Sequence, residues 1–337
     1  MKVLVSGGAG FIGSHIVDLL VENNFQVIVV DNLSSGREEN INSQAKFYKI
    51  DIVKEDKLEE VFKKEKPNYI IHQAAQISVS FSVRNPLFDA KVNILGSLNL
   101  LKQAIKYQTK GIVFASSGGT VYGEPESFPI TEDYPFQPNS PYGISKVAIE
   151  YYLKFFQANY GLDYISLRYG NVYGPRQEAQ GEAGVIAIFI EKMLKGEIPT
   201  INGDGEYIRD YIYVQDVARA NLLALKYMLK LFKVKLEGKT LDQKKGNPRI
   251  NGFNLGTGKG TTVNQLFALL KEIIQFPYSA HYGPPRPGDL RKNILDGQLI
   301  KEIWGWQPEV ILPVGLKETV RWFNEKIKKE TKEQIKR

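Results

Sequence analysis

A glycine-rich loop close to the first residue constrains the fold of this chain more than any other feature. Residues 2–6 form a short apolar run, Gly7-Gly8-Ala9-Gly10-Phe11-Ile12-Gly13 follows at once, and an amphipathic stretch continues to about Asn23. This order predicts a strand, a tight turn and a helix. Glycines let the backbone turn sharply and approach a pyrophosphate, whose charge is favoured by the free N–H groups of a helix start. The segment therefore predicts a dinucleotide site.

An acidic residue at the end of the next apolar run supports this interpretation. Residues 26–30 predict a second strand that ends in Asp31, about 20 residues beyond the loop, where an acid holds the adenosine ribose hydroxyls. A carboxylate at that position repels a 2′-phosphate, so NAD is favoured over NADP. Arg37 keeps the second cofactor open, because a nearby arginine can accommodate the phosphate.

Strands and helices alternate through the rest of the first half. Strands are predicted at residues 46–50 before Asp51, 69–72 before Gln73-Ala74-Ala75, 111–116 and 162–168, and helices near residues 57–65, 89–107 and 142–160. Such alternation predicts an α/β fold, a Rossmann-type doubly wound parallel sheet with ligands at the carboxyl ends of its strands. Ala74 and Ala75 at one such end would leave room for a cofactor, although tight packing explains them equally well.

The alternation becomes less regular after about residue 170, where glycines and prolines multiply. We expect a smaller C-terminal α/β substrate-binding lobe, separated from the sheet by a cleft. The predicted NAD-binding domain is residues 1–170, with about 206–230 returning to it; residues 171–205 and 231–325 belong mainly to the smaller lobe, and 326–337 form a charged tail. Within the lobe, residues 231–249 predict a surface hairpin or mobile excursion.

A tyrosine and a lysine four residues apart, Tyr142 and Lys146, follow Pro141. Proline can begin a helix but not sit inside one, so both side chains are expected on one face of the first turns. The charge of Lys146 is expected to lower the pKa of Tyr142, which could then act as a base near neutral pH. The same spacing also occurs by chance on solvated helices.

The strand at residues 111–116 runs into Ser116-Ser117-Gly118-Gly119. A hydroxyl at the carboxyl end of a strand could share a proton with a sugar hydroxyl and with Tyr142, although Ser and Gly are also ordinary turn residues. The order along the chain, namely glycine loop, acid, strand-end serines and then Tyr-x-x-x-Lys, favours the catalytic interpretation.

Composition excludes several kinds of site. The 337 residues include no cysteine, which excludes disulfides and thiolate chemistry, and the three scattered histidines predict no metal centre. The net charge of +7 comes from dispersed lysines, with runs only at residues 226–245 and 326–337 that we interpret as solvated surface. No apolar run reaches the roughly 18 residues of a membrane span, and a strand pattern begins at once. We expect a cytoplasmic protein with no nucleic-acid or membrane partner.

Nine motifs, taken together, resemble those of one family. They are Gly7 to Gly13, Asp31-Asn32-Leu33, His72 to Ala75, Ser116 to Gly123, Tyr142 to Lys146, Leu167 to Pro175, Arg209 to Val214, Asn254 to Gly258 and Arg286-Pro287-Gly288-Asp289. The chain resembles the extended short-chain dehydrogenase/reductases, in particular the NAD-dependent nucleotide-sugar epimerase and dehydratase family. Within that family it is most similar to the UDP-glucose 4-epimerases.

The resemblance implies an NAD-dependent isomerase that interconverts UDP-glucose and UDP-galactose in galactose metabolism, through a 4-keto sugar. It implies Tyr142, Lys146 and Ser117 as catalytic residues and no metal. The implied cofactor-binding residues are Gly7, Gly10, Phe11, Ile12, Gly13, Asp31, Asn32, Gly36, Asp51, Ile52, Ala74, Ala75, Gln76, Asn93, Tyr142, Lys146, Tyr169 and Val172. The implied substrate-binding residues are Ser117, Tyr142, Asn171, Arg209, Arg286 and Asp289. The two arginines suit a diphosphate, although isolated arginines are more often surface ion-pair partners.

Several alternatives remain open. The resembling dehydratases carry Asp-Glu after the strand-end hydroxyl residue, and Gly118-Gly119 here favours epimerisation. UDP-glucuronate, UDP-xylose and N-acetylated sugars are possible epimerase substrates, and by resemblance the small Asn293 favours tolerance of UDP-GlcNAc. A non-catalytic dinucleotide-sensing protein is the alternative from another class. The family implies a homodimer through the helices at 142–160 and 89–107, whose apolar faces could equally be buried within one chain.

Overall fold

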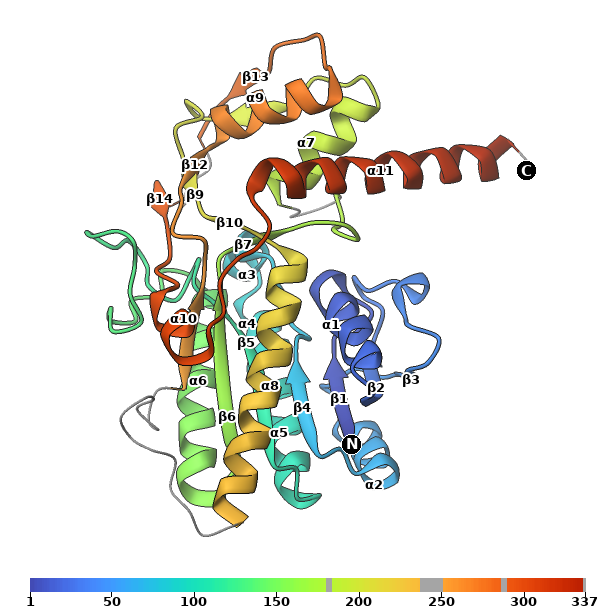
Figure 1. Cartoon of the computed structure of the whole chain (residues 1–337), viewed down its shortest axis with the longest axis vertical. Coiled ribbons are helices and arrows are strands. Elements are labelled where there is room, and N and C mark those ends of the chain that lie inside the picture. The colour runs from blue at the N-terminus through green and yellow to red at the C-terminus, as the bar shows by residue number, and fades with distance from the viewer. Residues whose placement is uncertain (180–183, 237–250, 286–289, 336–337) are drawn as a thin grey trace.

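A computed structural model describes residues 1–179, 184–236, 251–285 and 290–335. Within these ranges seven strands form one parallel sheet in the order β11-β6-β5-β4-β1-β2-β3, as predicted for a Rossmann-type fold (Figure 1). Arg286, Asp289 and residues 237–249 of the predicted excursion lie outside the described residues. The strands are β1 (Lys2–Ser6), β2 (Gln26–Asp31), β3 (Lys46–Lys49), β4 (Tyr69–His72), β5 (Gly111–Ser117), β6 (Asp163–Tyr169) and β11 (Gly252–Leu255).

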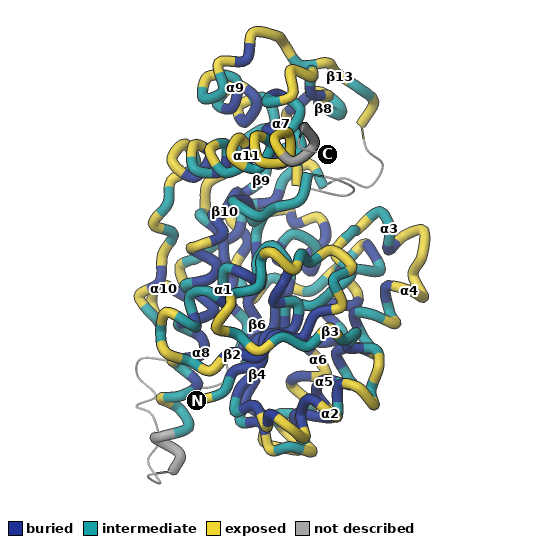
Figure 2. The backbone as a smooth tube through the Cα atoms, turned by 90° about the vertical axis from the view of Figure 1, so that its right-hand side faces the viewer, coloured by how far each residue is buried: buried dark blue, intermediate teal, exposed yellow. Residues whose placement is uncertain are grey.

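Both faces of the sheet are covered by helices, which explains why its strands are almost continuously apolar. Helices α1 (Phe11–Glu22) and α8 (Val214–Leu236) cover one face of the sheet, and Val3 and Val5 of β1 point toward them. Leu4 points to the other face, which is covered by α2 (Glu55–Glu65), α5 (Gly96–Lys106) and α6 (Pro141–Tyr160). The buried segments accordingly concentrate along the sheet (Figure 2).

Two helical predictions need correction. The helix expected at residues 89–107 begins earlier and is divided into α4 (Pro86–Ala90), a π-helical turn η2 (Lys91–Leu95) and α5, after a separate α3 (Val79–Arg84). The surface excursion expected from residue 231 begins later, because α8 continues as a helix to Leu236. The apolar residues of α8 join the same core as α1 as far as Leu229.

The order of the strands creates a crevice at the carboxyl ends of β1 and β4. β1 pairs with β2 on one side and with β4 on the other, so the chain leaves these neighbouring strands in opposite directions. The connections that follow their carboxyl ends therefore diverge, and ligands of open parallel sheets bind at such a point.

A smaller lobe lies beyond the carboxyl ends of the strands, at the top of Figure 1. Its core joins α7 (Val185–Leu194), α9 (Val263–Ile274) and α11 (Leu312–Ile335). The short strands around it are β7 (Asn171–Tyr173), β8 (Thr200–Asn202), β9 (Ile208–Arg209), β10 (Tyr211–Tyr213), β12 (Thr261–Thr262), β13 (His281–Gly283) and β14 (Lys292–Asn293). Two elements of the later chain belong with the main sheet: β11 extends it at one edge, and α10 (Gln298–Trp304) packs on β11.

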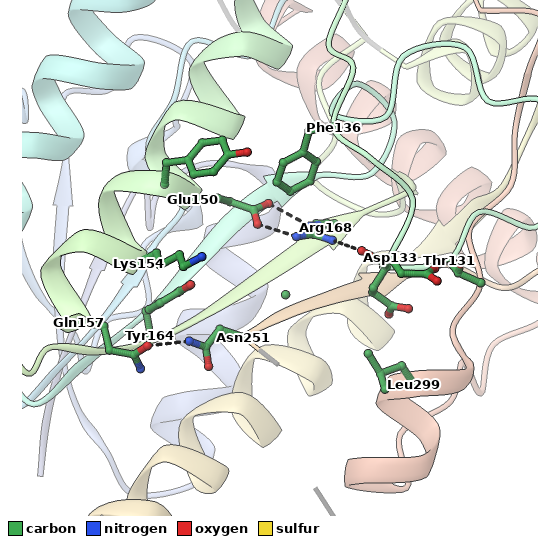
Figure 3. A pocket seen from close by; sticks show the side chains of 13 residues that line it. Thr131, Asp133, Phe136, Glu150, Lys154, Gln157, Tyr164, Arg168, Asn251 and Leu299 are labelled. Carbon is green, nitrogen blue, oxygen red and sulfur yellow. Dashed lines mark hydrogen bonds and ion pairs between the residues drawn. The ribbon is translucent and has the colours of Figure 1, made fainter. Parts of the chain in front are cut away.

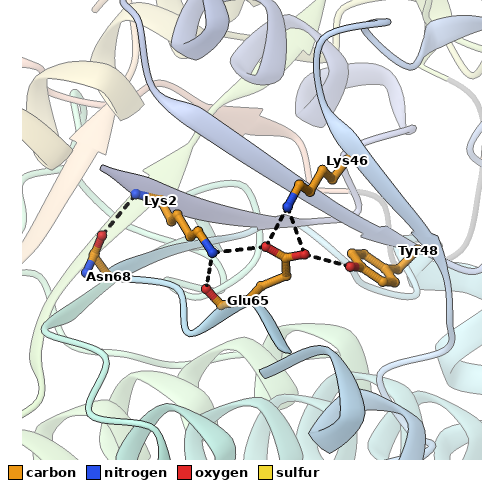
Figure 4. A network of polar contacts seen from close by, with 5 residues as sticks. All are labelled: Lys2, Lys46, Tyr48, Glu65 and Asn68. Carbon is orange, nitrogen blue, oxygen red and sulfur yellow. Dashed lines mark hydrogen bonds and ion pairs between the residues drawn. The ribbon is translucent and has the colours of Figure 1, made fainter. Parts of the chain in front are cut away.

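A buried carboxylate connects α2 to two strands at their amino ends, opposite the crevice. Glu65, at the end of α2, accepts hydrogen bonds from Lys2 on β1 at 3.2 Å, from Lys46 on β3 at 3.1 Å and from Tyr48 at 2.7 Å (Figure 4). Burial opposes ionisation of Glu65, but these bonds prevail and lower its pKa to about 2. The network thus fastens α2 to two strands, far from the crevice.

No described helix is long and apolar enough to cross a membrane.

Candidate active site

A hollow of about 160 Å³ follows the carboxyl ends of β1, β2 and β4. It brings together most of the residues expected to bind the cofactor. Its lining includes Gly7, Gly10, Phe11, Ile12, Gly13, Asp31, Asn32, Asp51, Ile52, Ala74 and Ala75. Four of the expected cofactor residues, Gly36, Gln76, Asn93 and Lys146, line neither this hollow nor the second one described below.

The glycine loop admits no side chain at its closest points. Gly7 has a φ of +72°, and a Cβ there would lie 2.6 Å from the Ala74 nitrogen. A Cβ on Gly13 would lie 2.1 Å from the Gly7 oxygen. Helix α1 begins after Gly10, which offers no side-chain cap, so its first N–H groups are available to a ligand. This loop fits a pyrophosphate of NAD.

Asp31, the last residue of β2, places a carboxylate in the lining of the crevice. It is only 7% exposed, and its carboxylate accepts hydrogen bonds from the backbone of Ala9 at 3.0 Å and Leu33 at 2.8 Å. Gly36 lies against it, since a Cβ there would be 3.0 Å from Asp31 Oδ1. The carboxylate still lines the hollow, where it can accept the hydroxyls of an adenosine ribose.

A second hollow, of about 510 Å³, lies between the sheet and the smaller lobe. Phe11, Ile12 and Ile77 line both hollows, so the two hollows adjoin. Six further residues that the sequence singled out line this second hollow: Ser117, Tyr142, Tyr169, Asn171, Val172 and Arg209.

The structure joins the tyrosine and the strand-end serine as predicted. Ser117 is the last residue of β5, and Tyr142 lies in the first turn of α6 after the cap residue Ser140 and Pro141. The Ser117 side chain hydrogen-bonds the Tyr142 phenol. A sugar hydroxyl in the cleft can therefore reach a serine and a tyrosine that already share a proton path.

Lys146 lies beneath Tyr142 and is 5% exposed. Its Nζ is 5.5 Å from the centre of the Tyr142 ring and donates to the Ala115 carbonyl oxygen at 2.8 Å. Burial lowers the pKa of Lys146 to about 8, against the opposing charges of Asp89 and Glu150. The expected lowering of the Tyr142 pKa is wrong for the chain by itself. Burial raises this pKa and outweighs the opposing hydrogen bond with Ser117.

A buried carboxylate that we did not anticipate organises the wall beside Lys146. Asp89, on α4, accepts hydrogen bonds from Gln76 Nε2 at 2.7 Å, from Asn93 Nδ2 at 3.0 Å and from the Ser145 hydroxyl. Gln76 and Asn93, both expected at the cofactor, are thereby fixed in place. Spacing relates Asp89 only to Asn93, one helical turn away, and the contact with Ser145 comes from the tertiary fold.

A buried ion pair lies beside Ser116, near the carboxyl end of β5. Arg168 on β6 donates to Glu150 on α6 at 3.0 and 2.8 Å, and Ser116 donates to the same carboxylate at 2.6 Å. Glu150 and Arg168 face each other in a further hollow, of about 850 Å³ (Figure 3). That hollow shares no described lining residue with the cleft of Tyr142. The pair holds Ser116, and through it the neighbouring Ser117.

The residues expected at the substrate are divided between the cleft and the undescribed segment. Asn171 on β7 lines the cleft, and its buried Nδ2 has no hydrogen-bond partner among the described residues. Arg209 on β9 also lines it. Asn293 on β14 is 2% exposed, and its Nδ2 donates to the Gly118 carbonyl oxygen at 3.1 Å. Arg286 and Asp289 are the two expected residues outside the described ranges.

Gly118 leaves no room for a side chain directly after Ser117. A Cβ there would lie 2.4 Å from Leu295 Cδ1, whereas a Cβ on Gly119 would lie 3.8 Å from the nearest atom, Ser117 Oγ. A carboxylate following the serine, as a dehydration site needs, would therefore require Leu295 to move.

A dinucleotide crevice that opens on a serine, a tyrosine and a neighbouring lysine defines a nicotinamide-dependent enzyme of the short-chain dehydrogenase/reductase class. Comparison with known families identifies the family within this class. The chain belongs to the NAD dependent epimerase/dehydratase family, whose model matches residues 3–231. NAD is therefore its cofactor, as the acid at the end of β2 predicted.

Individual relatives are similar to this chain over almost its whole length. A putative UDP-glucose 4-epimerase of Methanocaldococcus jannaschii is 47% identical and covers 95% of this chain and 98% of its own. The Thermotoga maritima UDP-glucose 4-epimerase, solved with UDP-glucose, is 53% identical with a TM-score of 0.89 over 97% of this chain and 100% of its own. The Thermus thermophilus UDP-glucose 4-epimerase, solved with NAD, is 42% identical with a TM-score of 0.84 over 96% and 99%.

Proposed function

We propose that this protein is a UDP-hexose 4-epimerase that interconverts UDP-glucose and UDP-galactose. One observation carries the proposal: the hydrogen-bonded pair of Ser117 and Tyr142 lies in a cleft that adjoins the dinucleotide crevice. The names of the similar proteins support the same substrates.

NAD, when bound, supplies an acceptor that takes the hydride of the sugar C4 and returns it to that carbon. The chain moves the proton. Ser117 contacts the sugar 4-hydroxyl and relays its proton to Tyr142 once the phenol is ionised. Lys146 stabilises that phenolate with its charge, and burial in the wall keeps it there. Asp89 and Glu150 keep Lys146 protonated by opposing the effect of burial on its pKa.

The cofactor contacts follow from the crevice. The loop from Gly7 to Gly13 holds the pyrophosphate, and Asp31 accepts the adenosine ribose hydroxyls. Lys146, Tyr142, Tyr169 and Val172 would hold the nicotinamide half, and the last three of them line the second hollow. Asp51 and Ile52 line the crevice and would hold the adenine.

The substrate is held by its diphosphate. Arg209 and Asn171 line the cleft as phosphate ligands, and the Asn171 Nδ2 has no hydrogen-bond partner among the described residues. The family resemblance assigns Arg286 to the diphosphate and Asp289 to the ribose. A firm grip on UDP and a loose one on the hexose let a 4-keto sugar turn about its diphosphate link and present its other face. Gly118, packed against Leu295, leaves no place for the carboxylate of a dehydratase.

A wider substrate range is favoured by one residue. Asn293 is buried beside Gly118, and its Oδ1 lacks a hydrogen-bond partner among the described residues. Asn293 does not itself line the described cleft. By the family resemblance, a small residue here in place of a bulky tyrosine favours an N-acetyl group on the sugar, so we include UDP-GlcNAc as a second substrate.

The active protein is proposed to be a homodimer in the cytoplasm, where NAD and nucleotide sugars are made. Support for the dimer comes from exposed apolar side chains on α4, η2 and α6, which pack side by side. These side chains are Leu87, Phe88, Leu95, Tyr151, Tyr152 and Phe155.

The test is to incubate the purified protein with UDP-galactose, without added reductant, and to look for UDP-glucose. UDP-GlcNAc and UDP-glucuronate in the same assay separate the other epimerase activities. Conversion of UDP-galactose is the expected result. Bound NAD without conversion of any of these sugars would replace the proposal with a sensing function.

A further inference from the structure

Arg37 belongs to the loop that follows Asp31 and borders the dinucleotide crevice. Its backbone N–H donates to the Ala9 carbonyl oxygen at 3.0 Å, and the preceding Gly36 packs against the Asp31 carboxylate. An arginine beside the acid that ends β2 is the residue type that accommodates this phosphate. The position alone would therefore favour NADP, in conflict with the charge of Asp31.

The guanidinium of Arg37 is already engaged. Its Nε and Nη2 donate to the two carboxylate oxygens of Glu178, the latter at 2.9 Å. Glu178 follows β7 in the smaller lobe, and Lys326 of α11 lies 3.7 Å from the same carboxylate. Arg37 does not line the crevice, although Asn32, Ser34 and Ser35 from the same loop do.

We propose that Glu178 is a specificity-determining residue: its bidentate pair with Arg37 withholds the guanidinium from the adenosine ribose and so preserves selection of NAD. Asp31 then faces the ribose without a neighbouring positive charge. The sequence places Glu178 far from the cofactor loop, so only the tertiary contact connects the two.

The size of the effect follows from the exposure of the pair. The Arg37 side chain is 39% exposed and that of Glu178 is 30% exposed, so water screens the pair and a phosphate dianion could compete for the guanidinium. Removing the Glu178 charge should therefore raise the affinity for NADP by about 10-fold, the scale of one charge-assisted hydrogen-bond pair. Asp31 continues to repel the phosphate, so NAD should remain the preferred cofactor.

The experiment compares Glu178→Gln with the unchanged protein. Each purified protein is equilibrated with equal concentrations of NAD and NADP and freed of excess nucleotide, and the bound nucleotides are released and separated by chromatography. The ratio of bound NADP to NAD should rise by about 10-fold in Glu178→Gln. Glu39→Gln is the matched control, because Glu39 lies 3.7 Å from Arg37 without a bidentate pair, and its ratio should stay unchanged.

The double variant Arg37→Gln/Glu178→Gln identifies the group responsible, because without the guanidinium the gain in NADP should disappear. Glu178→Ser is a second single variant, for the case that Glu178→Gln does not fold. An unchanged ratio in the single variants, or a gain that persists in the double variant, would overturn the proposal. The readout needs no sugar substrate, so it is independent of the epimerase assay.

Discussion

Tyr142 is a protonated phenol in the chain at neutral pH, because burial raises its pKa above the ordinary value of 10.0. The hydrogen bond with Ser117 opposes this effect only in part. Lys146 retains its charge at pH 7, since its own pKa falls only to about 8. Ionisation of the phenol therefore depends on positive charge gathered around it when the cleft is filled. The empty site therefore holds little phenolate that could act as a base, and we expect Tyr142 to act only on a bound substrate.

The first prediction concerns this phenol. Tyr142→Phe should lower turnover of UDP-galactose by roughly 100-fold or more, because the proton acceptor is lost. Ser117→Ala should lower it less, by about 10-fold, because a water molecule can relay the proton. Initial rates of both variants, with bound NAD measured as a check on the site, give the comparison. Undiminished turnover in Tyr142→Phe would remove the tyrosine from the mechanism.

Some site residues could be predicted from sequence and others could not. The glycine loop, Asp31, Ser117 and the Tyr-x-x-x-Lys segment each carry a local signal, and the structure brings them to one cleft. The sign of the Tyr142 pKa shift had no such signal, because it depends on which side chains exclude water. Contacts between distant residues, such as Asp89 with Ser145, are likewise invisible before the fold is known.

At the scale of elements, the end of β5 is fixed by close packing against the segment after β14. Gly118 allows this approach, since Leu295 would lie 2.4 Å from a Cβ on that residue. We expect Gly118→Ala to lower the free energy of unfolding by about 1–3 kcal/mol through overpacking. Gly119→Ala is the control, because its nearest neighbour would be 3.8 Å away. Denaturant titration of the two variants should separate them, and equal stabilities would refute the packing argument.

The Glu65 network predicts a pH dependence of stability. The pKa of Glu65 falls from 4.5 to about 2 in the folded chain, so its contribution is complete above about pH 5 and is lost as the pH falls toward 2. Glu65→Gln should lower the free energy of unfolding by about 2 kcal/mol at pH 7, because hydrogen bonds to a charged group are lost. The difference from the unchanged protein should shrink between pH 5 and 2. A difference that stays constant with pH would show that the charge of Glu65 is not involved.

Element types were predictable where periodicity was strong, and pairing was less so. The apolar runs of β1, β2, β4 and β5 and the helix α6, which begins at Pro141, are all found as predicted. The π-helical turn at Lys91–Leu95 has no pattern of its own, because it changes the helical register by one residue. The place of β11 beside β6 depends on an association between segments far apart in the chain.

The whole molecule has two lobes, and its cleft needs both: the sheet supplies Ser117 and Tyr142, and the smaller lobe supplies Arg209. The exposed apolar side chains of α6 lie outside this cleft. We predict that the protein sediments at twice the 38.1 kDa mass of the chain and that Phe155→Glu, which places a charge on the exposed face, yields monomers. Analytical ultracentrifugation measures both. A monomeric unchanged protein would contradict the dimer.

The central claim is that one carbon of the sugar is oxidised and then reduced with the same hydride. It is tested most directly with UDP-galactose that carries deuterium at C4, incubated with the protein in ordinary water and analysed by NMR. The account predicts UDP-glucose with the deuterium still at C4, because the hydride leaves and returns within one closed cleft. Loss of the deuterium to solvent, or label at another carbon, would contradict it.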